Sequence, residues 1–516
     1  MAKQHVASIK TGALYGFSGV EVRVEVDIRA GLPSLQIVGM GNKAIDEARQ
    51  RVRSAILNAG LTFPAKKIIV NLSPAELPKD GAHFDLPIAI GILQASGQIP
   101  AAKLKGVAFA GELSLGGDLL PIRGATLIAE AAQKAGATLL YLPVKNYHQA
   151  AIVEGVKSIA ITSLRQILEH LYGAIPSPEP PPPPQATTEA PGSLNNTQPS
   201  FDAIRGQEAA KRALTLAVAG RHNILLCGPP GTGKTHLARA AATLFPPLSA
   251  EEIIEVSKLH SITRGDAGYI TTAPLRAPHH SVTLTALIGG GLYPMPGDIS
   301  LAHRGALLLD ELPEYPRAIL EALRQPLENK SISLSRLYGS ITYPADTVVI
   351  GTMNPCPCGF YGDKQKECRC TGAQIMQYSK KLSGPLLDRI DLFTAVPRTQ
   401  NEYLFDTKVM TKSQHLTAVN LIKSISSIQK ERYNCSSTYN GNATNEHIKK
   451  LFHISKEAHV LMKKAQHNLQ LSGRGVLRTL RVARTAADAD GSVTIEPRHI
   501  AEALQFRSHL EAGFLP

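Results

Sequence analysis

The chain has 516 residues, of which 43% are apolar and 19% charged, and it carries a formal net charge of +13. A chain of this length is expected to hold about two to four domains with a large core, and its composition is ordinary for a soluble globular protein. The positive charge favours a polyanionic partner such as nucleic acid over a neutral one.

No apolar run approaches the roughly 18 residues that a membrane-spanning helix needs. The N-terminal stretch MAKQHVASIKTGALYGFSGV has neither a long apolar segment nor a cleavage-like site, so no export signal is predicted. We therefore expect a cytoplasmic protein with no membrane contact. In a reducing compartment, clustered cysteines are expected to bind a metal rather than to form disulfides.

Residues 1–173 alternate between strand-like and helix-like patterns. Glu21–Ile28 and Lys66–Leu72 have the composition of strands, and Asn42–Gly60 has helical periodicity with a glycine at its end. Two more helices are predicted in the stretches DLPIAIGILQAS and TLIAEAAQKAGA. This part of the chain is predicted to be a mixed α/β domain.

Residues 174–200 form the clearest boundary in the chain. The stretch is rich in Pro, Ser, Thr and Asn and has almost no apolar anchors. Such a composition predicts an extended, partly polyproline linker between two folded parts.

Residues 201–398 repeat a strand–loop–helix pattern. Gly206–Gly220 is a predicted helix, Asn223–Cys227 a predicted strand and Thr235–Phe245 a predicted helix, and the stretches GALLLDE and DTVVIGTMN are later buried strands. This repetition predicts a parallel sheet in an α/β fold. Residues 399–516 are mostly helical in pattern and are predicted to form a small helical lid.

The stretch GPPGTGKT fits the phosphate-binding pattern G-x-x-x-x-G-K-[ST] and lies between a predicted strand and a predicted helix, as such a loop requires. Its residues are Gly228, Pro229, Pro230, Gly231, Thr232, Gly233, Lys234 and Thr235. Glycines let backbone N–H groups turn inward around phosphates, and the start of the helix favours negative charge. Lys234 is predicted to reach the β- and γ-phosphates and Thr235 to bind Mg²⁺, so ATP and Mg²⁺ are the predicted cofactors.

Two acidic residues end the predicted strand in ALLLDE. Asp310 is expected to hold the magnesium ion through water, and Glu311 to orient and polarise the attacking water. Asn354 ends the next predicted strand, and strand carboxyl ends face the ligand crevice of a parallel sheet, so it is a further candidate for positioning that water. Taken singly, the acidic pair could cap a helix instead, and the asparagine could be a turn residue.

Three arginines are candidates for contacting nucleotide phosphates. Arg389 lies between apolar residues and aspartates in SGPLLDRIDL, where it is either a salt-bridged surface residue or a finger that reaches the γ-phosphate of a neighbouring subunit. Arg474 and Arg478 lie four residues apart in LSGRGVLRTLRVART, and one of them could contact the nucleotide from the lid.

Four of the six cysteines lie within fifteen residues, as two C-x-C pairs made by Cys356, Cys358, Cys368 and Cys370. Four thiolates suit a tetrahedral Zn²⁺ site, so a structural zinc ion is the predicted ligand. An iron–sulfur cluster, two disulfides, a redox pair and a site with no metal are the alternatives. The loop from residue 356 to residue 370 is also basic, so it could touch a DNA backbone.

The motifs of the second half follow one another in a distinctive order: IRGQEAAKRAL, GPPGTGKT, LRAPHHSVTLTALIGGG, PGDISLAHRGALLLDELPEY, LRQPLENKSISLSR, TMNPCPCGF and GPLLDRIDL. Together they resemble the magnesium-chelatase-like branch of the AAA+ ATPases, and within it the YifB/ComM family, over nearly the whole chain. The resemblance implies an AAA+ P-loop core with a parallel sheet and a helical lid. It further implies a ring-forming ATPase, a hexamer, with ATP bound between subunits.

The resemblance also implies roles for single residues. Asn354 matches the sensor-1 residue, Arg389 the arginine finger and Arg474 the sensor-2 arginine, with Arg478 as the alternative for the last role. The stretch HHSVTLTALIGGGLYPMPG resembles the helix-2 insertion of this branch, and Asn329–Ala345 the β-hairpin before sensor 1. Such insertions point into the pore of ring motors, so Lys330 and Arg336 are candidate DNA contacts, the alternative being a solvated charged hairpin.

The N-terminal part resembles the Lon-protease-like domain, whose catalysis uses a Ser–Lys dyad. In the matching stretches of this chain, His83 stands in place of the serine and Thr126 in place of the lysine. Because a nucleophile needs an activating base, we expect a non-proteolytic scaffold or a DNA-binding domain.

The family role implied by the resemblance is that of a DNA motor, a helicase or branch-migration enzyme in homologous recombination. Its expected substrate is single-stranded or branched DNA, integrated during natural transformation. The alternatives are an AAA+ protein remodeller or Lon-like ATP-dependent protease and, with less support, a magnesium chelatase subunit. The chelatase alternative has less support because no metal-ion-adhesion domain with a D-x-S-x-S motif is recognised in this sequence.

Overall fold

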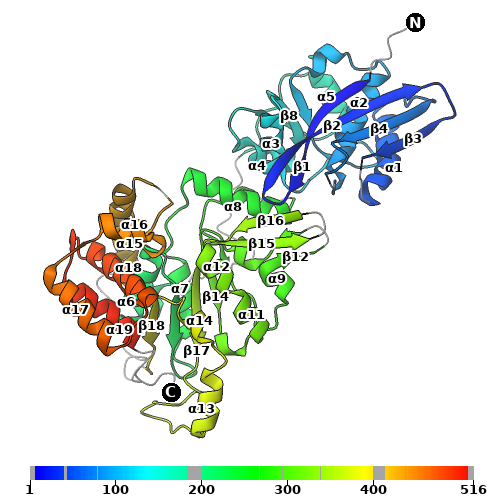
Figure 1. The fold of residues 1–516 in the computed structure, drawn as a ribbon. Coiled ribbons are helices and arrows are strands. Elements are labelled where there is room, and N and C mark those ends of the chain that lie inside the picture. The colour runs from blue at the N-terminus through cyan, green and yellow to red at the C-terminus, as the bar shows by residue number, and fades with distance from the viewer. Residues whose placement is uncertain are drawn as a thin grey trace.

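The computed structural model of the chain describes residues 6–39, 43–77, 79–182, 199–265, 268–291, 294–336, 339–398, 413–435 and 437–508. An N-terminal α/β domain lies over a second α/β domain, and a group of helices flanks the second (Figure 1). Most of the predicted linker, residues 183–198, and the start of the predicted lid, residues 399–412, lie outside the described residues. In the described part of the chain, no helix is long and apolar enough to cross a bilayer.

The N-terminal domain is built on a seven-stranded sheet of order β3-β4-β2-β1-β5-β8-β9. Its strands are β1 (Ala7–Tyr15), β2 (Ser18–Arg29), β3 (Ser34–Val38), β4 (Lys67–Ser73), β5 (Val107–Phe109), β8 (Leu139–Pro143) and β9 (Lys157–Ile161). A small separate pair is formed by β6 (Glu112–Leu113) and β7 (Leu119–Leu120). Strand β2 pairs antiparallel with β1 and with β4, whereas β3–β4 and the run β1-β5-β8-β9 are parallel. The predicted mixed α/β domain is therefore what the structure shows.

Helices cover both faces of this sheet. They are α1 (Lys43–Asn58), α2 (Asp85–Ala95), α3 (Ala125–Lys134), α4 (Tyr147–Ala151) and α5 (Leu164–Leu171). The apolar α2 packs on the face of β2 that holds Val22, Val24 and Val26. On the other face α3 lies so close that a Cβ on Gly19 would be 1.8 Å from the carbonyl oxygen of Leu127. Only glycine permits this approach, so α3 is fixed against the strands.

The second domain contains a five-stranded sheet in which all strands run parallel, in the order β11-β14-β17-β10-β18. Its strands are β10 (Ile224–Cys227), β11 (Leu275–Arg276), β14 (Ala306–Leu309), β17 (Val348–Met353) and β18 (Leu392–Ala395). The burial of every residue of β10, β14 and β17 explains their continuous apolar sequences. The parallel sheet predicted for the core is confirmed.

The helices of this domain are α6 (Glu208–Gly220), α7 (Lys234–Ala242), α8 (Ala250–Thr263), α10 (Asp298–Leu301), α11 (Arg317–Ala322), α12 (Arg324–Asn329), α13 (Gly372–Ser379) and α14 (Gly384–Leu387). A first insertion contains α9 (Leu284–Ile288), β12 (Gly289–Gly290) and β13 (Met295–Pro296), and a second is the hairpin of β15 (Ser331–Arg336) and β16 (Gly339–Pro344). Figure 1 shows this hairpin projecting beneath the N-terminal domain. Both insertions occur where the sequence predicted them.

The lid consists of α15 (Gln414–Tyr433), α16 (Asn445–Leu451), α17 (Lys456–Asn468), α18 (Gly473–Ala489) and α19 (Pro497–Ser508), with a short pair of β19 (His453–Ile454) and β20 (Thr494–Ile495). Helices α15 and α18 pack against α6, and one apolar cluster joins the lid to that side of the parallel sheet. The lid is thus part of one continuous core with the second domain.

The two α/β domains touch through α3 and α8. Leu127 of α3 belongs to the same apolar cluster as Leu259 of α8. Around it, Lys258 forms an ion pair with Glu130 and lies 5.6 Å from the ring centroid of Phe17, and the N–H of Gly124 donates to the Ser261 carbonyl at 2.8 Å. The N-terminal domain therefore packs on helix α8 of the second domain.

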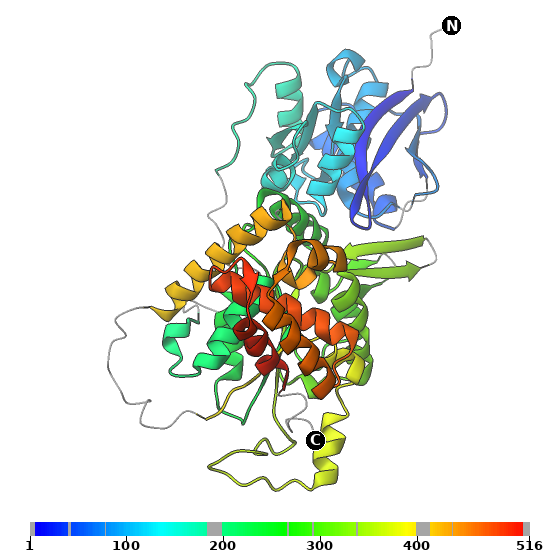
Figure 2. The same ribbon diagram turned by 60° about the vertical axis from the view of Figure 1, so that its left-hand side comes forward.

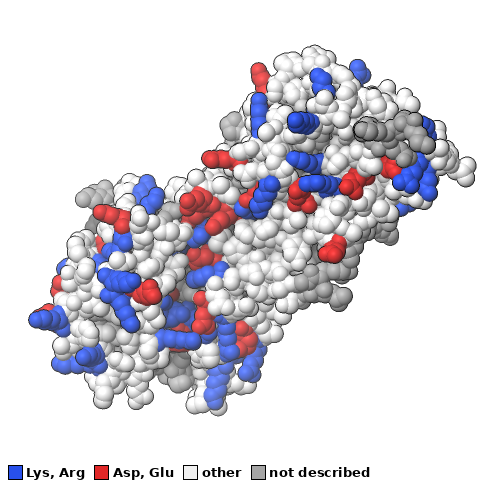
Figure 3. Space-filling model, turned by 45° about the horizontal axis from the view of Figure 1, so that its top comes forward, with Lys and Arg blue, Asp and Glu red and all other residues white. Residues whose placement is uncertain are grey.

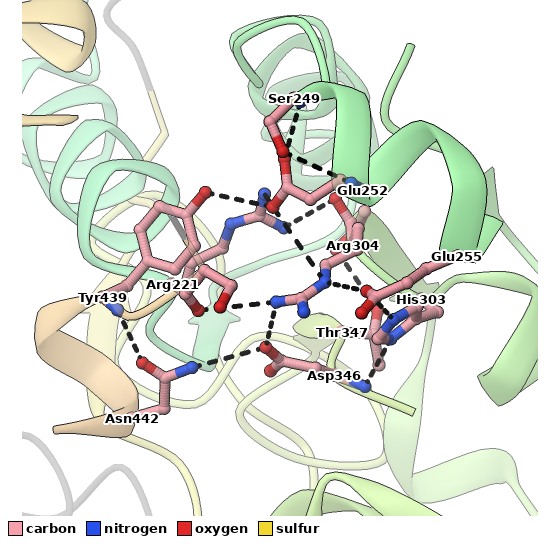
Figure 4. A network of polar contacts seen from close by, with 12 residues as sticks. Arg221, Ser249, Glu252, Glu255, His303, Arg304, Asp346, Thr347, Tyr439 and Asn442 are labelled. Carbon is pink, nitrogen blue, oxygen red and sulfur yellow. Dashed lines mark hydrogen bonds and ion pairs between the residues drawn. The ribbon is translucent and has the colours of Figure 1, made fainter. Parts of the chain in front are cut away.

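A network of buried charges joins α8 to the lid at the amino-terminal ends of the parallel strands (Figure 4). Arg304 contacts Glu255 at 2.9 Å and Asp346 at 3.2 Å. Arg221 donates to the Arg304 carbonyl at 2.6 Å and lies 4.8 Å from the ring centroid of Tyr439 in the lid. Such a network is stable only while its opposite charges stay matched.

Two carboxylates of this network have strongly depressed pKa values. The hydrogen bond from His303, together with Arg304, lowers the pKa of Glu255 to about 2 despite its burial. Burial alone would raise the pKa of Asp346, but the charges of Lys330, Arg221 and Arg304 lower it to about 2. Both groups are ionised in the folded protein.

We predict that Asp346→Ala destabilises the second domain by about 3 kcal/mol, because it leaves buried arginines without their counter-charge. Since the folded-state pKa lies below the ordinary value of 3.8, this contribution is complete above pH 3.8 and is lost as the pH falls towards 2. Calorimetric unfolding between pH 7 and about pH 2 measures it. Glu446→Ala, which removes an exposed pair with Lys450, is the control and should change stability by less than about 0.5 kcal/mol. Equal stability of the two variants at pH 7 contradicts the prediction.

Candidate active site

The phosphate-binding loop lies at the carboxyl end of β10, between β17 and β18 in the parallel sheet. It starts after β10 and leads into α7, with Gly231 at φ +77° and Gly233 at φ +84°. A Cβ on Gly228 would be 2.2 Å from the carbonyl oxygen of Val396, so only glycine fits this first position. The sequence of the loop is thus dictated by its backbone, which presents N–H groups at the start of a helix.

Lys234 lies at the centre of the site. Its Nζ donates to the carbonyls of Gly228 and Pro229, both at 2.8 Å, and to the side-chain oxygen of Asn354 at 3.1 Å. Burial lowers the pKa of Lys234, although nearby acidic groups oppose this shift. A phosphate that enters the loop would find the ammonium group of Lys234 already pointing into the loop. The phosphate oxygens would replace the two backbone carbonyls as hydrogen-bond acceptors of that group.

The two carboxylates predicted at the end of β14 lie beside the loop. Asp310 accepts hydrogen bonds from Thr235 Oγ1, at 3.0 and 3.1 Å, and from Thr352 Oγ1 at 2.5 Å. Glu311 follows in the left-handed region at φ +52°, and its N–H donates to Thr352 Oγ1 at 3.0 Å. The Glu311 side chain is exposed, so it faces the open side of the site.

This arrangement fits a nucleotide with Mg²⁺. Oxygen ligands from Thr235 and Asp310 are the kind that Mg²⁺ prefers, and the loop amides with Lys234 suit a triphosphate. Bound Mg²⁺ would neutralise charge on the phosphates. Glu311 and Asn354 also lie close to Lys234.

The candidate arginines lie at the opposite edge of the sheet. Arg389 and Arg474 pair with different oxygens of one carboxylate, that of Glu328 on α12, and the Arg474 pair is 3.0 Å long. The hydrogen bond from Arg389 and the charges of both arginines hold the pKa of Glu328 below its ordinary value. Arg389 has a side chain only 12% exposed, whereas that of Arg474 is 63% exposed.

Arg478 is held more tightly. It donates to Asp391 at 2.6 Å and to the Arg389 carbonyl at 3.0 Å, and Asp391 in turn accepts from the N–H of Asn223. Asn223 and Asp391 directly precede β10 and β18, so these contacts fix the arginines to the amino ends of the strands.

A cavity of about 330 Å³ opens at this edge, and its lining includes Arg389, Arg474, Arg478 and Arg481. Arg481 is largely buried, which lowers its pKa, and its Nε has no hydrogen-bond partner among the described residues. Neither Arg481 nor Glu328 is among the residues predicted from the sequence. The only signal for Arg481 was its place three residues after Arg478 on a helix, where side chains share a face.

One strand length separates the two groups of residues. Four residues of β10 span roughly 13 Å at 3.3 Å per residue. Arg389, Arg474 and Arg478 therefore do not lie beside the phosphate-binding loop of their own chain. The structure brings together Lys234, Thr235, Asp310, Glu311 and Asn354, and it brings together the arginines, but it does not bring these two sets to one another.

The four predicted cysteines form a cluster in the loop between β17 and α13, which projects from the second domain (Figure 2). The sulfur atoms all lie within 4.8 Å of one another, with Cys356 3.4 Å from Cys358 and 3.6 Å from Cys368. Zinc–sulfur bonds of about 2.3 Å in a tetrahedron place sulfur atoms roughly 3.8 Å apart, so the donor set fits a metal ion of that size.

The two predicted DNA contacts lie in different parts of the β15–β16 hairpin. Lys330 directly precedes β15 and pairs with Asp346 at 3.3 Å, so it is placed at the base of the hairpin, beside the arginine-lined cavity. Arg336 pairs in register with Gly339 next to the turn, and its side chain lies outside the described residues. Of these two residues, only Arg336 therefore lies near the tip of the hairpin, the position that would favour contact with DNA in a pore.

The two positions compared with the Lon dyad are both buried. His83 hydrogen-bonds the Gly12 carbonyl at 3.0 Å, and burial lowers the pKa of His83 to about 4. Thr126 donates to the Gln149 carbonyl at 2.9 Å. Both side chains are buried in the N-terminal domain.

Charged side chains of both signs are interspersed over the face in Figure 3, which looks onto the top of the molecule. The net charge of +13 is therefore not gathered into one basic patch on this face. A polyanion would have to be bound elsewhere or by local groups.

Three stretches match family models. Residues 200–404 match "Magnesium chelatase, subunit ChlI", residues 24–146 match "Subunit ChlI of Mg-chelatase", and residues 414–507 match "Magnesium chelatase, subunit ChlI C-terminal". The matches cover both α/β domains and the lid.

Relatives are similar over almost the full length. YifB of Salmonella typhimurium is 38% identical over 509 residues, which cover 98% of this chain and 97% of the relative. Competence protein ComM of Haemophilus influenzae is 39% identical over 505 residues, covering 98% and 97%. A more distant and partial match, 28% identical over 185 residues, is to a probable DNA helicase MCM9 of Arabidopsis thaliana, covering 36% of this chain and 24% of that protein.

We predict that Glu311→Gln keeps nucleotide affinity but lowers ATP hydrolysis by at least about 100-fold, because the amide cannot polarise water. Fluorescent-nucleotide binding and phosphate release measure the two effects separately. Glu314→Gln is the matched control, since Glu314 is a nearby exposed acid paired with Lys381. A Glu311→Gln protein that hydrolyses ATP at the rate of the control contradicts the assignment.

Proposed function

The chain belongs to the YifB/ComM family of magnesium-chelatase-like AAA+ ATPases, and we propose that it is an ATP-driven DNA motor that works as a ring of identical copies. The observation that carries this proposal is the separation of the site into two edges of one sheet. The phosphate-binding residues lie at the carboxyl edge, and the arginines that pair with Glu328 and Asp391 lie at the amino edge. Two copies in head-to-tail contact would complete one nucleotide site between them.

Head-to-tail contacts that close on themselves generate rings. Each interface would join the loop of one copy to Arg389 and Arg474 of the next, where positive charge stabilises the transition state of phosphoryl transfer. In this interface Arg389 is the arginine finger and Arg474 is the sensor-2 residue. Arg478 positions Arg389 by donating a hydrogen bond to the backbone carbonyl of Arg389. Six copies is the number that the family resemblance implies.

Glu328 is the group that a neighbouring nucleotide would displace. It pairs with both arginines in the single chain, and a γ-phosphate presents more negative charge than one carboxylate. The partly exposed Glu328 can move aside into water at low cost, because surface ion pairs are weak.

DNA is the proposed substrate of the motor. The net charge of +13, a relative named for competence and a partial relative named as a DNA helicase support this. The projecting β15–β16 hairpin has Arg336 next to its turn and is the element proposed to contact DNA. Nucleotide-driven movement of the hairpin would push it along a DNA strand. Branch migration of single-stranded or branched DNA in homologous recombination, during natural transformation, is the process that the competence relative suggests.

The N-terminal domain is proposed to act as a non-proteolytic scaffold or DNA-binding domain. The burial of His83 and Thr126 supports this, because a protease needs an accessible nucleophile. A protein remodeller or a protease is the alternative outcome that the test below separates from a DNA motor.

The cysteine cluster is proposed to hold one zinc ion. Its support is a set of four sulfur donors at tetrahedral spacing in a loop of mostly exposed residues. Such a loop lacks an apolar core of its own, and a structural metal takes the place of one.

We predict that DNA raises the ATPase rate and that the protein with ATP moves a branched DNA junction. Lys234→Ala should lose both activities, because the loop then has no cation for the phosphates. Lys450→Ala, an exposed lysine of the lid, is the control and should keep both. Junction movement by Lys234→Ala with ATP contradicts the motor. ATP-dependent unfolding or degradation of a protein substrate, with an ATPase rate that does not respond to DNA, favours the remodeller or protease instead.

A further inference from the structure

The cysteine loop rests directly on the phosphate-binding loop. Gly359, which follows the first C-x-C pair, is buried against Pro230. A Cβ on Gly359 would be 2.6 Å from Pro230 Cδ and 3.8 Å from Asn354 Cγ. No side chain fits in this position, so the two loops are in van der Waals contact through a glycine.

The conformation of the turn at Gly359 is fixed by contacts with Cys356. Gly359 has φ +84°, and its N–H donates to the Cys356 carbonyl at 2.9 Å. The N–H of Tyr361 donates to the sulfur of Cys356 at 3.3 Å. The turn that brings Gly359 to Pro230 is therefore part of the same structure that gathers the sulfur atoms.

Asn354 stands at the root of the loop. It lies two residues before Cys356, and its side-chain oxygen accepts from Lys234 Nζ at 3.1 Å. Tyr378 is buried on α13, at the far end of the loop, and the nearby backbone of Asn354 opposes the rise in the Tyr378 pKa that burial causes. The two ends of the cysteine loop thus meet near the residue that contacts Lys234.

Few contacts besides those of the cysteines hold this loop. Tyr361, Gly362 and all residues from Lys364 to Glu367 are exposed. Arg398 pairs with Asp363 at 2.7 Å, and Lys366 and Arg398 lie over the ring of Phe360. Four sulfur atoms within 4.8 Å of one another suit a single metal ion, which takes the place of an apolar core in such a loop.

From these contacts we propose that the metal-bound cysteine loop positions the nucleotide site, so that ATP binding requires the metal centre through the packing of Gly359 on Pro230. The inference rests on the zinc site proposed above and adds that this site acts on the ATPase rather than only on the stability of a distant loop. Gly359 is a positioning residue, since it touches the phosphate-binding loop and not the reacting atoms.

The chain offers a matched pair of glycines for the test. Gly362 lies three residues from Gly359 in the same loop and has φ +75°, but a Cβ there would have no atom within 4 Å. Gly359→Ala and Gly362→Ala thus impose similar backbone strain, and only the first pushes on Pro230. The full-length protein is used in each case, with bound zinc measured by elemental analysis and affinity measured with a fluorescent ATP analogue without DNA.

We predict that Gly359→Ala keeps equimolar zinc but binds the ATP analogue at least about tenfold more weakly than Gly362→Ala, because the added methyl displaces the loop. Pro230→Ala removes the ring atoms that this methyl meets. The double variant Gly359→Ala, Pro230→Ala should therefore bind better than the product of the two single effects predicts. Equal affinity of the two glycine variants overturns the proposal.

A metal arm tests the same claim without the glycine. Cys368→Ser should lose zinc and at least about tenfold in nucleotide affinity, whereas Cys435→Ser, an exposed cysteine outside the cluster, should keep both. If Cys368→Ser loses zinc and binds the analogue like the parent protein, the proposal is wrong even if Gly359→Ala does not fold. Because no DNA is present, these results do not depend on whether the protein is a DNA motor, and parent protein purified with no zinc refutes the metal site separately.

Discussion

All five strands of the second domain run in the same direction, and this constraint decides what a single copy of the chain can do. The carboxyl ends of β10, β14 and β17 bring Lys234, Asp310 and Asn354 together around one loop. The amino ends carry a different set, in which Arg389 and Arg474 close on Glu328. Since the sheet holds these two sets apart, the proposed ring would complete each site by placing the amino edge of one copy against the carboxyl edge of another. In that proposal, assembly and catalysis are linked by the direction of the strands.

The amino edge also holds the parts of the molecule together. Arg221 lies three residues before β10, and Arg304 and Asp346 lie two residues before β14 and β17. Together they connect α8 to Tyr439 and Asn442 in the lid (Figure 4). Helix α8 in turn carries the N-terminal domain through Leu127 and Glu130. Lys330 joins the base of the hairpin to the same charges. The surface that would receive a neighbour's nucleotide is thus in contact with the lid, the hairpin and the helix under the N-terminal domain.

Local patterns in the sequence were enough to predict the phosphate-binding loop, the strands that end in Asp310 and Asn354, and the grouping of the cysteines. These features depend on hydrophobic periodicity and on motifs of closely spaced residues, so they can be recognised without knowledge of the tertiary contacts. Strand β1 was not predicted, because the lysine and glycine in ASIKTGALY interrupt its alternation and the pairing with β2 supplies what propensity lacks. Glu328, Arg481 and the packing of Gly359 on Pro230 join residues far apart in the chain. Lys330 was expected among the pore contacts, but its ion pair with Asp346 holds it at the hairpin base.

The central claim is that each nucleotide site is completed by a second copy, and mixing two inactive variants tests it most directly. Lys234→Ala lacks a working phosphate-binding loop, and Arg389→Ala lacks the finger. In random rings of equal amounts of both, about a quarter of the interfaces would pair an intact loop with an intact finger. The account predicts ATPase activity in the mixture well above that of either variant alone. A mixture that forms mixed rings by native mass spectrometry and shows only the sum of the two separate activities would contradict it.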